Sequence, residues 1–274
     1  MIYDLHAHTL YSDGDKTPLE VVRLAEERGV AVAITDHDEC RGFGEISHMR
    51  FSVPVYAGIE LAAKFEGSVH ILGLGINWQD AGIVGHIDWA RDARRSRAER
   101  ILEKLRAGGM ELHLSDLVFQ GDVVGRAHIA EALVRMGYAQ SVQDAFERFL
   151  SYKAPYYVPY EKIGADGAAR LIRGAGGLPV LAHPGLMAQG AWDRLLPKLK
   201  EYGFWGVEAY HPAHSDGQCR EFQSLARREG LFVTAGSDYH GSVKPEISLG
   251  QETRGGLYLQ ESMEVFTAFT KGNA

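Results

Sequence analysis

The chain begins with MIYDLHAHTLYSDGDKTP (residues 1–18), and the fold can be worked out from this stretch. A short apolar run leads into two histidines, His6 and His8, and a polar turn that carries Asp13 follows. Side chains two residues apart on a strand point to the same side, so His6 and His8 can hold one ion between them. The stretch therefore predicts a first strand, starting at Ile2, with metal-binding side chains at its carboxyl end.

Short apolar runs alternate with amphipathic helical patterns along most of the chain. TPLEVVRLAEERG (residues 17–29) is the clearest helix, because Thr17, Pro18 and Glu20 are start signals and Gly29 is a stop signal. The run VAVAIT follows as a continuous apolar strand of the kind buried on both faces. Similar runs are VPVYAGI, VHILGLGI, LPVLA, WGVEAY and LFVTAG, and helical patterns lie near 165–175, 191–202, 216–229 and 262–271. The alternation predicts an α/β fold whose βα units surround a parallel sheet, closed or nearly closed as a barrel.

One region interrupts this alternation. Residues 78–157 contain helical patterns, among them DWARDARRSRAERILEKLRAGG, GRAHIAEALVRMG and SVQDAFERFL, and no convincing strand. We therefore expect a barrel built from residues 1–77 and 158–274, with residues 78–157 inserted as a helical cap. Within the barrel part, Pro197 predicts a break in the helix near 191–202.

The composition limits the classes of protein to consider. The chain has 274 residues, of which 45% are hydrophobic, which suffices for one large core. The net charge of −7 argues against a broad grip on long duplex nucleic acid, but not against a nucleotide or short oligonucleotide at a metal site. Cys40 and Cys219 give no disulfide framework. With no membrane-spanning stretch and no room for a signal peptide before Ile2, we expect a cytoplasmic protein without a membrane partner.

Chemically active side chains recur where the predicted strands end. A lone histidine on an apolar strand is more often a hydrogen-bonded core residue, but burial of polarity at five strand ends without a ligand would be costly. In parallel barrels the active site forms at this edge, and a mixture of imidazoles and carboxylates suits more than one ion of zinc, manganese or iron. The residues are His6, His8, Asp36, His37, Asp38, Glu60, His183, Asp238 and His240, with His70 as an exception inside its strand.

The motifs around these residues resemble the PHP (polymerase and histidinol phosphatase) family. They are DLHAHTLYSDG, ITDHD, GIE, HILGLGI, LAHPG and GSDYH, in that order. The resemblance implies a distorted (β/α)7 TIM-like barrel with two or three divalent ions, manganese, iron or zinc. It implies a first metal bound by His6, His8, Glu60 and Asp238, a second by Glu60, His70 and His183, and a third by Asp13, His37 and His240. Catalytic roles would fall to Glu60, Asp13, His37 and His240.

The inserted residues 78–157 resemble one branch of the family in particular. The segments GRAHIAEALVRMGYAQSVQDAFERFL and YYVPY are similar to the cap of PHP phosphoesterases that act on nucleotides. This implies that Arg126 and His128 face the substrate phosphate, although both could belong to an ordinary helix start. A guanidinium matches phosphate oxygens bidentately. The implied activity is metal-dependent hydrolysis of a phosphomonoester of a small nucleotide, such as a nucleoside 3',5'-bisphosphate or an AMP-like compound, with trimming of short 5'-phosphorylated RNA as a related activity.

Several alternatives remain open at this point. The activity could instead be that of a histidinol phosphatase, or the chain could be a non-catalytic PHP metal-binding module. His211 and His214 either contact the substrate or line the rim of the site. Asp36 and Asp38 either orient a ligand imidazole or cap a turn. The arginine-rich run from Arg91 to Arg106 is expected to be a solvated helix face rather than a surface that steers phosphate.

Overall fold

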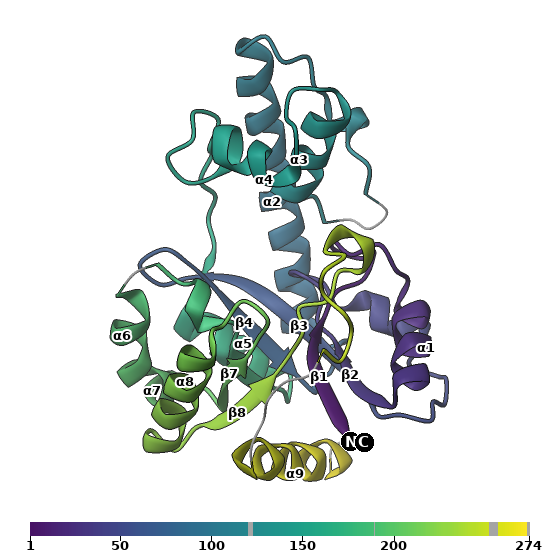
Figure 1. Cartoon of the computed structure of the whole chain (residues 1–274), viewed down its shortest axis with the longest axis vertical. Helices are drawn as coiled ribbons and strands as arrows, with labels where there is room; N and C mark the ends of the chain where they lie inside the picture. Colours follow the sequence, from purple (N-terminus) through teal and green to yellow (C-terminus); the bar gives the residue numbers. More distant parts are fainter. Residues whose placement is uncertain (120–122, 189, 252–256, 273–274) are drawn as a thin grey trace.

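The computed structural model describes residues 1–274 except 120–122, 189, 252–256 and 273–274, and its centre is one mixed sheet (Figure 1). The strands are β1 (Ile2–Ala7), β2 (Val30–Ile34), β3 (Val55–Lys64), β4 (Ser68–Leu74), β5 (Ile163–Gly164), β6 (Leu178–Leu181), β7 (Gly206–Tyr210) and β8 (Phe232–Ala235). Their order is β1-β2-β3-β4-β6-β7-β8, and β5 pairs with β3. The predicted α/β class is confirmed.

The sheet of the described residues is not closed, so the distorted (β/α)7 TIM-like barrel expected from the sequence is not confirmed. Strands β1 and β8 stand at the two ends of the strand order, and the described residues form no ladder between them. The end of β1 is nevertheless bonded to the segment after β8: the Asp238 amide donates to the His6 carbonyl and the His8 amide donates to the Tyr239 carbonyl, both at 2.9 Å, and Ala7 forms an isolated parallel bridge with Tyr239. These bonds bring the first and last strands together at the edge where the predicted ligands lie.

Strand β4 corrects the prediction of a parallel sheet. It runs antiparallel to both of its neighbours, β3 and β6. The loop 65–67 is too short for the crossover that a parallel strand needs, and Glu66 (φ 48°) and Gly67 (φ 139°) take the positive φ values of a tight hairpin loop. Strand β3 also continues to Lys64, past Glu60, where the sequence analysis ended it. The reversal places the beginning of β4, with His70, at the edge formed by the carboxyl ends of the parallel strands.

Helices pack beside the sheet as the alternation predicts. Helix α1 has a capping box in which Thr17 Oγ1 accepts from the Glu20 amide and Glu20 accepts from the Thr17 amide. The predicted break at Pro197 is confirmed, since a short 3-10 turn (Leu196–Lys198) separates α6 from α7. The helices beside the sheet are α1 (Pro18–Arg28), α5 (Ala165–Gly174), α6 (Ala191–Leu195), α7 (Leu199–Tyr202), α8 (Asp216–Arg228) and α9 (Leu257–Gly272), and further 3-10 turns are Arg41–Glu45, Leu114–Asp116, Pro184–Leu186 and Gly241–Val243.

The inserted region forms a helical layer at one end of the sheet (Figure 1). It contains α2 (Ala81–Ala107), α3 (Arg126–Arg135), α4 (Val142–Ala145) and a π-helical turn (Phe146–Leu150). Its apolar side chains form a cluster of their own, drawn from residues 98–158. Helix α2 joins this cluster to the main core, because Ile83 and Ile87 pack with the sheet while Ile101 and Leu105 pack inside the insertion. Among the described helices none is both long and apolar enough to span a membrane.

The capping box of α1 gives a stability prediction. Thr17→Ala removes the side-chain acceptor for the Glu20 amide and should lower the free energy of unfolding by about 1 kcal/mol in urea denaturation. Ser96→Ala, at an exposed position inside α2, is the control and should leave stability unchanged or slightly raised. Equal stability of the two variants would contradict a contribution from the box.

Candidate metal centre

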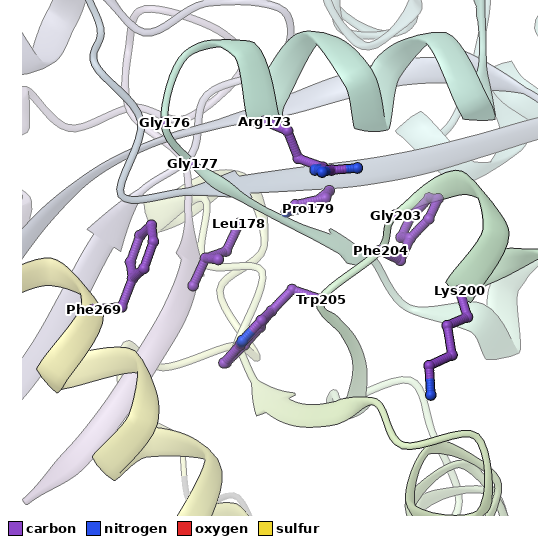
Figure 2. Close-up of a pocket in the computed structure, with 10 residues that line it drawn as sticks. All are labelled: Arg173, Gly176, Gly177, Leu178, Pro179, Lys200, Gly203, Phe204, Trp205 and Phe269. Atoms are coloured by element: carbon purple, nitrogen blue, oxygen red, sulfur yellow. The ribbon is translucent and has the colours of Figure 1, made fainter.

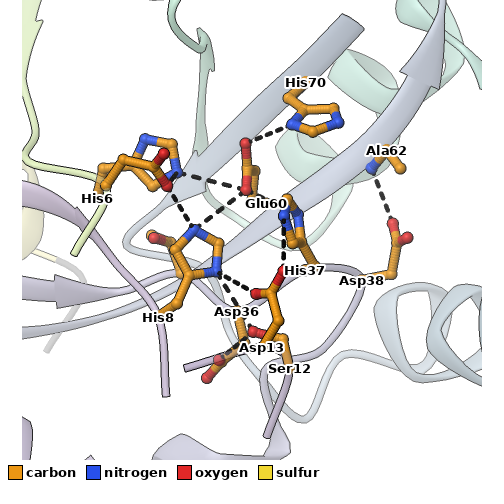
Figure 3. A network of polar contacts seen from close by, with 12 residues as sticks. His6, His8, Ser12, Asp13, Asp36, His37, Asp38, Glu60, Ala62 and His70 are labelled. Atoms are coloured by element: carbon orange, nitrogen blue, oxygen red, sulfur yellow. Dashed lines mark hydrogen bonds and ion pairs between the residues drawn. The ribbon is translucent and has the colours of Figure 1, made fainter. Parts of the chain in front are cut away.

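The structure brings all nine predicted ligands to one edge of the sheet. Figure 3 labels six of them, His6, His8, Asp13, His37, Glu60 and His70. The parallel strands deliver most of the nine ligands at or just beyond their carboxyl ends, and the reversed strand β4 delivers His70 near its amino end. The ligands are His6 in β1 and His8 just after it, Asp13 in the following loop, His37 after β2, Glu60 in β3, His70 in β4, His183 after β6, and Asp238 and His240 after β8. Ligand-bearing crevices of open α/β sheets lie at this edge.

The first predicted ligand group surrounds one point. His6 Nε2 lies 3.4 Å from Glu60 Oε2 and 3.5 Å from Asp238 Oδ1. His8 Nε2 lies 3.3 Å and 3.2 Å from the same two oxygens. Two imidazole nitrogens thus face two carboxylate oxygens, with both histidines and Glu60 fully buried.

Two further groups adjoin the first. The other oxygen of Glu60, Oε1, lies 2.8 Å from His70 Nδ1 and 3.0 Å from His183 Nε2. Asp13 Oδ1 lies 3.2 Å from His240 Nε2, and Asp13 Oδ2 lies 3.8 Å from His37 Nε2. His37 Nδ1 also lies 2.8 Å from Glu60 Oε2. Glu60 therefore contacts residues of all three predicted groups.

The groups whose ligand atoms lie within 4.8 Å of one another are divided differently from the three sets that the resemblance implies: they are His8, Asp13, His37 and His240; His6, His8 and Asp238; His6, Glu60 and His183; and His37, Glu60 and His70. The assignment of these side chains to individual ions stays a prediction.

The chemistry of the donor set fits divalent cations. Several buried nitrogen and oxygen atoms of the predicted ligands have no hydrogen-bond partner among the described residues, although they lie within a few ångströms of one another. These atoms include His6 Nε2, His8 Nε2, Asp13 Oδ1, His37 Nδ1 and Glu60 Oε2. Buried polar atoms are normally paired, and a set that converges without pairing suits ions bound between them.

The electrostatics of the site are those of coupled opposite charges. Burial alone would raise the pKa of Glu60, but His37, His70 and His6 hold it well below the usual value. Burial would lower the pKa of His8, yet Asp238 and Glu60 raise it to about 9. Burial wins at His70 and lowers its pKa to about 4, against the attraction of Glu60. A cation that binds at His8 must therefore displace a proton.

Strained backbone is concentrated at this edge. Asp38 (φ 47°), His183 (φ 24°) and Asp238 (φ 55°) are three of the five described non-glycine residues with positive φ, and all three adjoin or belong to the ligand set. Such conformations cost about 1–3 kcal/mol each and persist only where neighbouring bonds fix them. At His183 the fixing bond is the amide hydrogen bond to Glu208 Oε2 at 2.8 Å.

Glu208 was missed by the sequence analysis. It lies fully buried in β7, and its Oε1 accepts from His6 Nδ1 at 3.0 Å. Since Nδ1 carries the proton in that bond, Nε2 of His6 faces the metal centre. Gly236 allows this arrangement, because a Cβ there would lie 2.3 Å from the His6 Cβ. The missed signal was a carboxylate inside the apolar run WGVEAY.

The contacts of Arg94 correct the expectation that the arginine-rich run from Arg91 to Arg106 is a solvated helix face. The Arg94 guanidinium is largely buried and donates to Asp38 Oδ2 from Nε at 2.8 Å and from Nη2 at 2.5 Å. Asp38 in turn accepts from the Ala62 amide at 2.9 Å. The segment beside His37 is thereby tied to helix α2. Asp36 accepts from Thr9 and Ser12, which lies against His8, so both acids support ligand segments.

Arg126 and His128 lie where helix α3 faces the site. Arg126 is the first residue of α3 and lines a pocket that also contains Asp13, His37 and His70. His128 is buried, and its Nδ1 accepts from the Gly125 amide at 3.1 Å. The expected phosphate contact of both residues stays a prediction.

The structure gives different surroundings to His211 and His214, whose roles the sequence left open. His214 uses both ring nitrogens on the backbone, since Nδ1 donates to the Ala209 carbonyl at 3.0 Å and Nε2 accepts from the Gly185 amide at 3.1 Å. It therefore holds the turn after His183. His211 Nε2 is buried without a hydrogen-bond partner among the described residues and lies 3.6 Å from Asp238 Oδ2, so it faces the metal centre.

A second and larger cavity, of about 570 Å³, lies at the opposite edge of the sheet, at the amino ends of β6 and β7 (Figure 2). Its lining includes Arg173, Lys200, Trp205 and Phe269. None of the predicted ligands contributes to it. We therefore place the candidate site at the predicted ligands rather than in this larger cavity.

Comparisons with known proteins identify the family of the chain. Residues 4–156 match the PHP domain, and the chain belongs to this family. The 3',5'-nucleoside bisphosphate phosphatase of Chromobacterium violaceum is 32% identical over 246 residues, with 86% of each chain covered. The 5'-3' exoribonuclease Rnm of Escherichia coli is 33% identical over 262 residues, covering 92% of this chain and 89% of Rnm. A crystal structure described as a metal-dependent phosphoesterase from Bifidobacterium adolescentis superposes with a TM-score of 0.83 at 31% identity over 95% of both chains. The predicted family is confirmed.

The two hydrogen bonds between the His214 ring and the backbone give a second prediction. His214→Ala leaves the Gly185 amide and the Ala209 carbonyl without their partner and should lower the unfolding free energy of the metal-free protein by about 2 kcal/mol. His48→Ala, at an exposed histidine, is the control. Urea denaturation followed by circular dichroism compares the unfolding free energies of the two variants. A His214 variant as stable as the control would show that these hydrogen bonds do not stabilise the fold.

Proposed function

We propose that the protein is a metal-dependent phosphoesterase that removes a phosphate from a small nucleotide, such as a nucleoside 3',5'-bisphosphate, and also trims short 5'-phosphorylated RNA. One observation carries this proposal: four overlapping groups of possible metal ligands, two of which contain Glu60, lie beside a pocket lined by cationic side chains. The named activities of the relatives point to the same chemistry.

The ligand groups suggest how many ions are bound. We assign His6, His8, Glu60 and Asp238 to the first ion, Glu60, His70 and His183 to the second, and Asp13, His37 and His240 to the third. Two or three ions of manganese, iron or zinc suit this set. Divalent cations at such a site orient phosphate oxygens, offset their charge and lower the pKa of a bound water.

The chain's own residues would position the substrate. The Arg126 guanidinium, at the start of α3, would bind phosphate oxygens, with His128 as its neighbour on the same helix. Glu208 and Asp238 orient imidazoles, because each fixes the nitrogen that bears the proton: His6 Nδ1 donates to Glu208, and His240 Nδ1 donates to the Asp238 carbonyl at 2.8 Å. We expect His37, His240, Asp13 and Glu60 to be the residues nearest the reacting phosphate.

The residues around the site suggest how the substrate enters. We propose that residues 78–157 are a cap subdomain, since their apolar cluster is separate from the main core. The substrate is then a small phosphorylated compound that enters between cap and sheet. Two free cysteines agree with a cytoplasmic location.

Phosphate release is the first test of the proposal. Metal-stripped protein refilled with manganese should hydrolyse adenosine 3',5'-bisphosphate and a short 5'-phosphorylated RNA faster than histidinol phosphate. Faster turnover of histidinol phosphate would favour that alternative. Bound metal without hydrolysis of any phosphoester would favour a non-catalytic module.

The ligand assignment predicts the effect of two substitutions. His8→Ala and Glu60→Gln each remove a donor from the first group and should reduce kcat at least a thousandfold, while the helical content by circular dichroism stays unchanged. Metal content measured by elemental analysis should fall in parallel. Glu99→Gln, on the exposed face of α2, is the matched control, and near-normal turnover of Glu60→Gln would overturn the assignment.

A further inference from the structure

The second cavity, at the amino ends of β6 and β7, is large enough for a small organic ligand (Figure 2). Its volume of about 570 Å³ lies inside the range of about 300–1,000 Å³ that is usual for ligand pockets. The ends of α5 and α7, the beginnings of β6 and β7, and α9 supply its walls. No predicted metal ligand is among the described lining residues, so a function of this cavity would be separate from the metal centre.

The cationic side of the cavity carries more charge than its surroundings offset. Arg173, in the last turn of α5, and Lys200, in the last turn of α7, are exposed lining residues. Neither forms an ion pair with another described residue, and the described lining includes no aspartate or glutamate. The carbonyl ends of the two helices offset at most about half an elementary charge each. Two whole charges therefore leave this side of the cavity positive.

The Arg173 guanidinium lies against the turn that follows α7. A Cβ at Gly203 would come within 2.3 Å of Arg173 Nη1, so the close approach depends on the missing side chain. Gly203 also has φ 83°, a backbone conformation that favours glycine. The guanidinium thus extends from the end of α5 to the turn after α7, and it forms part of the cavity wall there.

The other walls are apolar and aromatic. Trp205 is half-buried, and the Phe232 ring stacks on it with centroids 4.7 Å apart and an interplanar angle of 18°. One face of the indole is therefore covered by the protein, while Trp205 still lines the cavity. In Figure 2, Leu178 and Phe269 lie to one side of Trp205 and the two cations lie to the other. Apolar and cationic groups are thus segregated across the cavity.

This segregation defines the chemistry of a matching ligand. Aromatic rings pack favourably on an open indole surface. A guanidinium and an ammonium form charge-assisted hydrogen bonds to carboxylate or phosphate oxygens. An inorganic anion would leave the aromatic wall unused, and an uncharged ring would leave both cations unpaired.

We propose that this cavity binds a small aromatic anion, a planar ring that carries a carboxylate or a phosphate group. The ring packs on Trp205, and the anionic group binds Arg173 and Lys200. The site does not depend on the proposed phosphoesterase activity, because it shares no described lining residue with the metal centre.

Calorimetric titration of the metal-free protein with 2-naphthoate, 2-naphthamide and adenosine 5'-monophosphate tests the site. The carboxylate should bind about tenfold more tightly than the amide, which keeps the ring and loses the charge. Displacement of 2-naphthoate by adenosine 5'-monophosphate would identify the ligand as a nucleotide. Binding of 2-naphthoate without such displacement would identify it as an aromatic carboxylate.

Substitutions locate the bound probe. Arg173→Gln and Lys200→Gln should each lower the affinity for the bound anion about tenfold, because each removes a charged donor. Arg170→Gln is the matched control, since Arg170 lies on the same helix, is paired with Asp166 at 2.8 Å and does not line the cavity. It makes the same change in net charge and should bind the probes as the unmodified protein does.

Three results would overturn the site. The first is that neither 2-naphthoate nor adenosine 5'-monophosphate loses affinity in Arg173→Gln and Lys200→Gln, whether because nothing binds or because the probe binds elsewhere. The second is equal binding of 2-naphthoate and 2-naphthamide, and the third is an equal loss of affinity in Arg170→Gln. The titrations need neither metal nor turnover, so these results leave the proposed phosphoesterase activity untouched, and absence of phosphate release leaves this site standing.

Discussion

The structure of this site depends on one buried carboxylate, that of Glu60. Its Oε2 lies against His6, His8 and His37, and its Oε1 lies against the two imidazoles of the second group. A fully buried charge without partners would cost several kcal/mol. Five imidazoles from four segments of the chain supply the partners, and each segment must therefore be placed where its histidines can reach the same carboxylate.

This requirement explains the irregular features of the sheet. Strand β4 is reversed, and a strand in that direction presents His70 near its beginning rather than at its end. The backbone of His183 and Asp238 takes positive φ, which each retains because its amide is bonded to the opposite side of the site, His183 to Glu208 and Asp238 to the His6 carbonyl. Strain at the ligands is thus offset by bonds that also orient other ligands.

The sequence could place the predicted ligand side chains at one edge of the sheet because their signal is local. A histidine or acid directly after an apolar run marks a strand end, and strand ends of a parallel sheet share one edge, so His6, His37 and Asp238 could be placed together without knowledge of contacts. Glu208 lies inside an apolar run, and its burial against His6 and the His183 amide is visible only in the folded structure.

Two other features could not be read from local patterns. The direction of β4 is set by a three-residue loop that resembles any other polar turn in the sequence. Arg94 and Arg97 lie on the same helix as exposed arginines, and only the place where α2 passes the metal centre distinguishes them. The helix is anchored at both ends in different apolar clusters, so its middle turns are held in place over the site.

The charge of the molecule as a whole and the charge of its pocket have opposite signs, and the difference matters for what can bind. At −7 the surface repels an extended polyanion, while the cations beside the metal centre attract phosphate over a distance of about 8 Å at physiological ionic strength. A long duplex meets the net negative surface over its whole length, whereas a mononucleotide or a short single strand meets mainly the pocket. The contrast between local and global charge therefore supports the small phosphorylated substrate that we propose for this site.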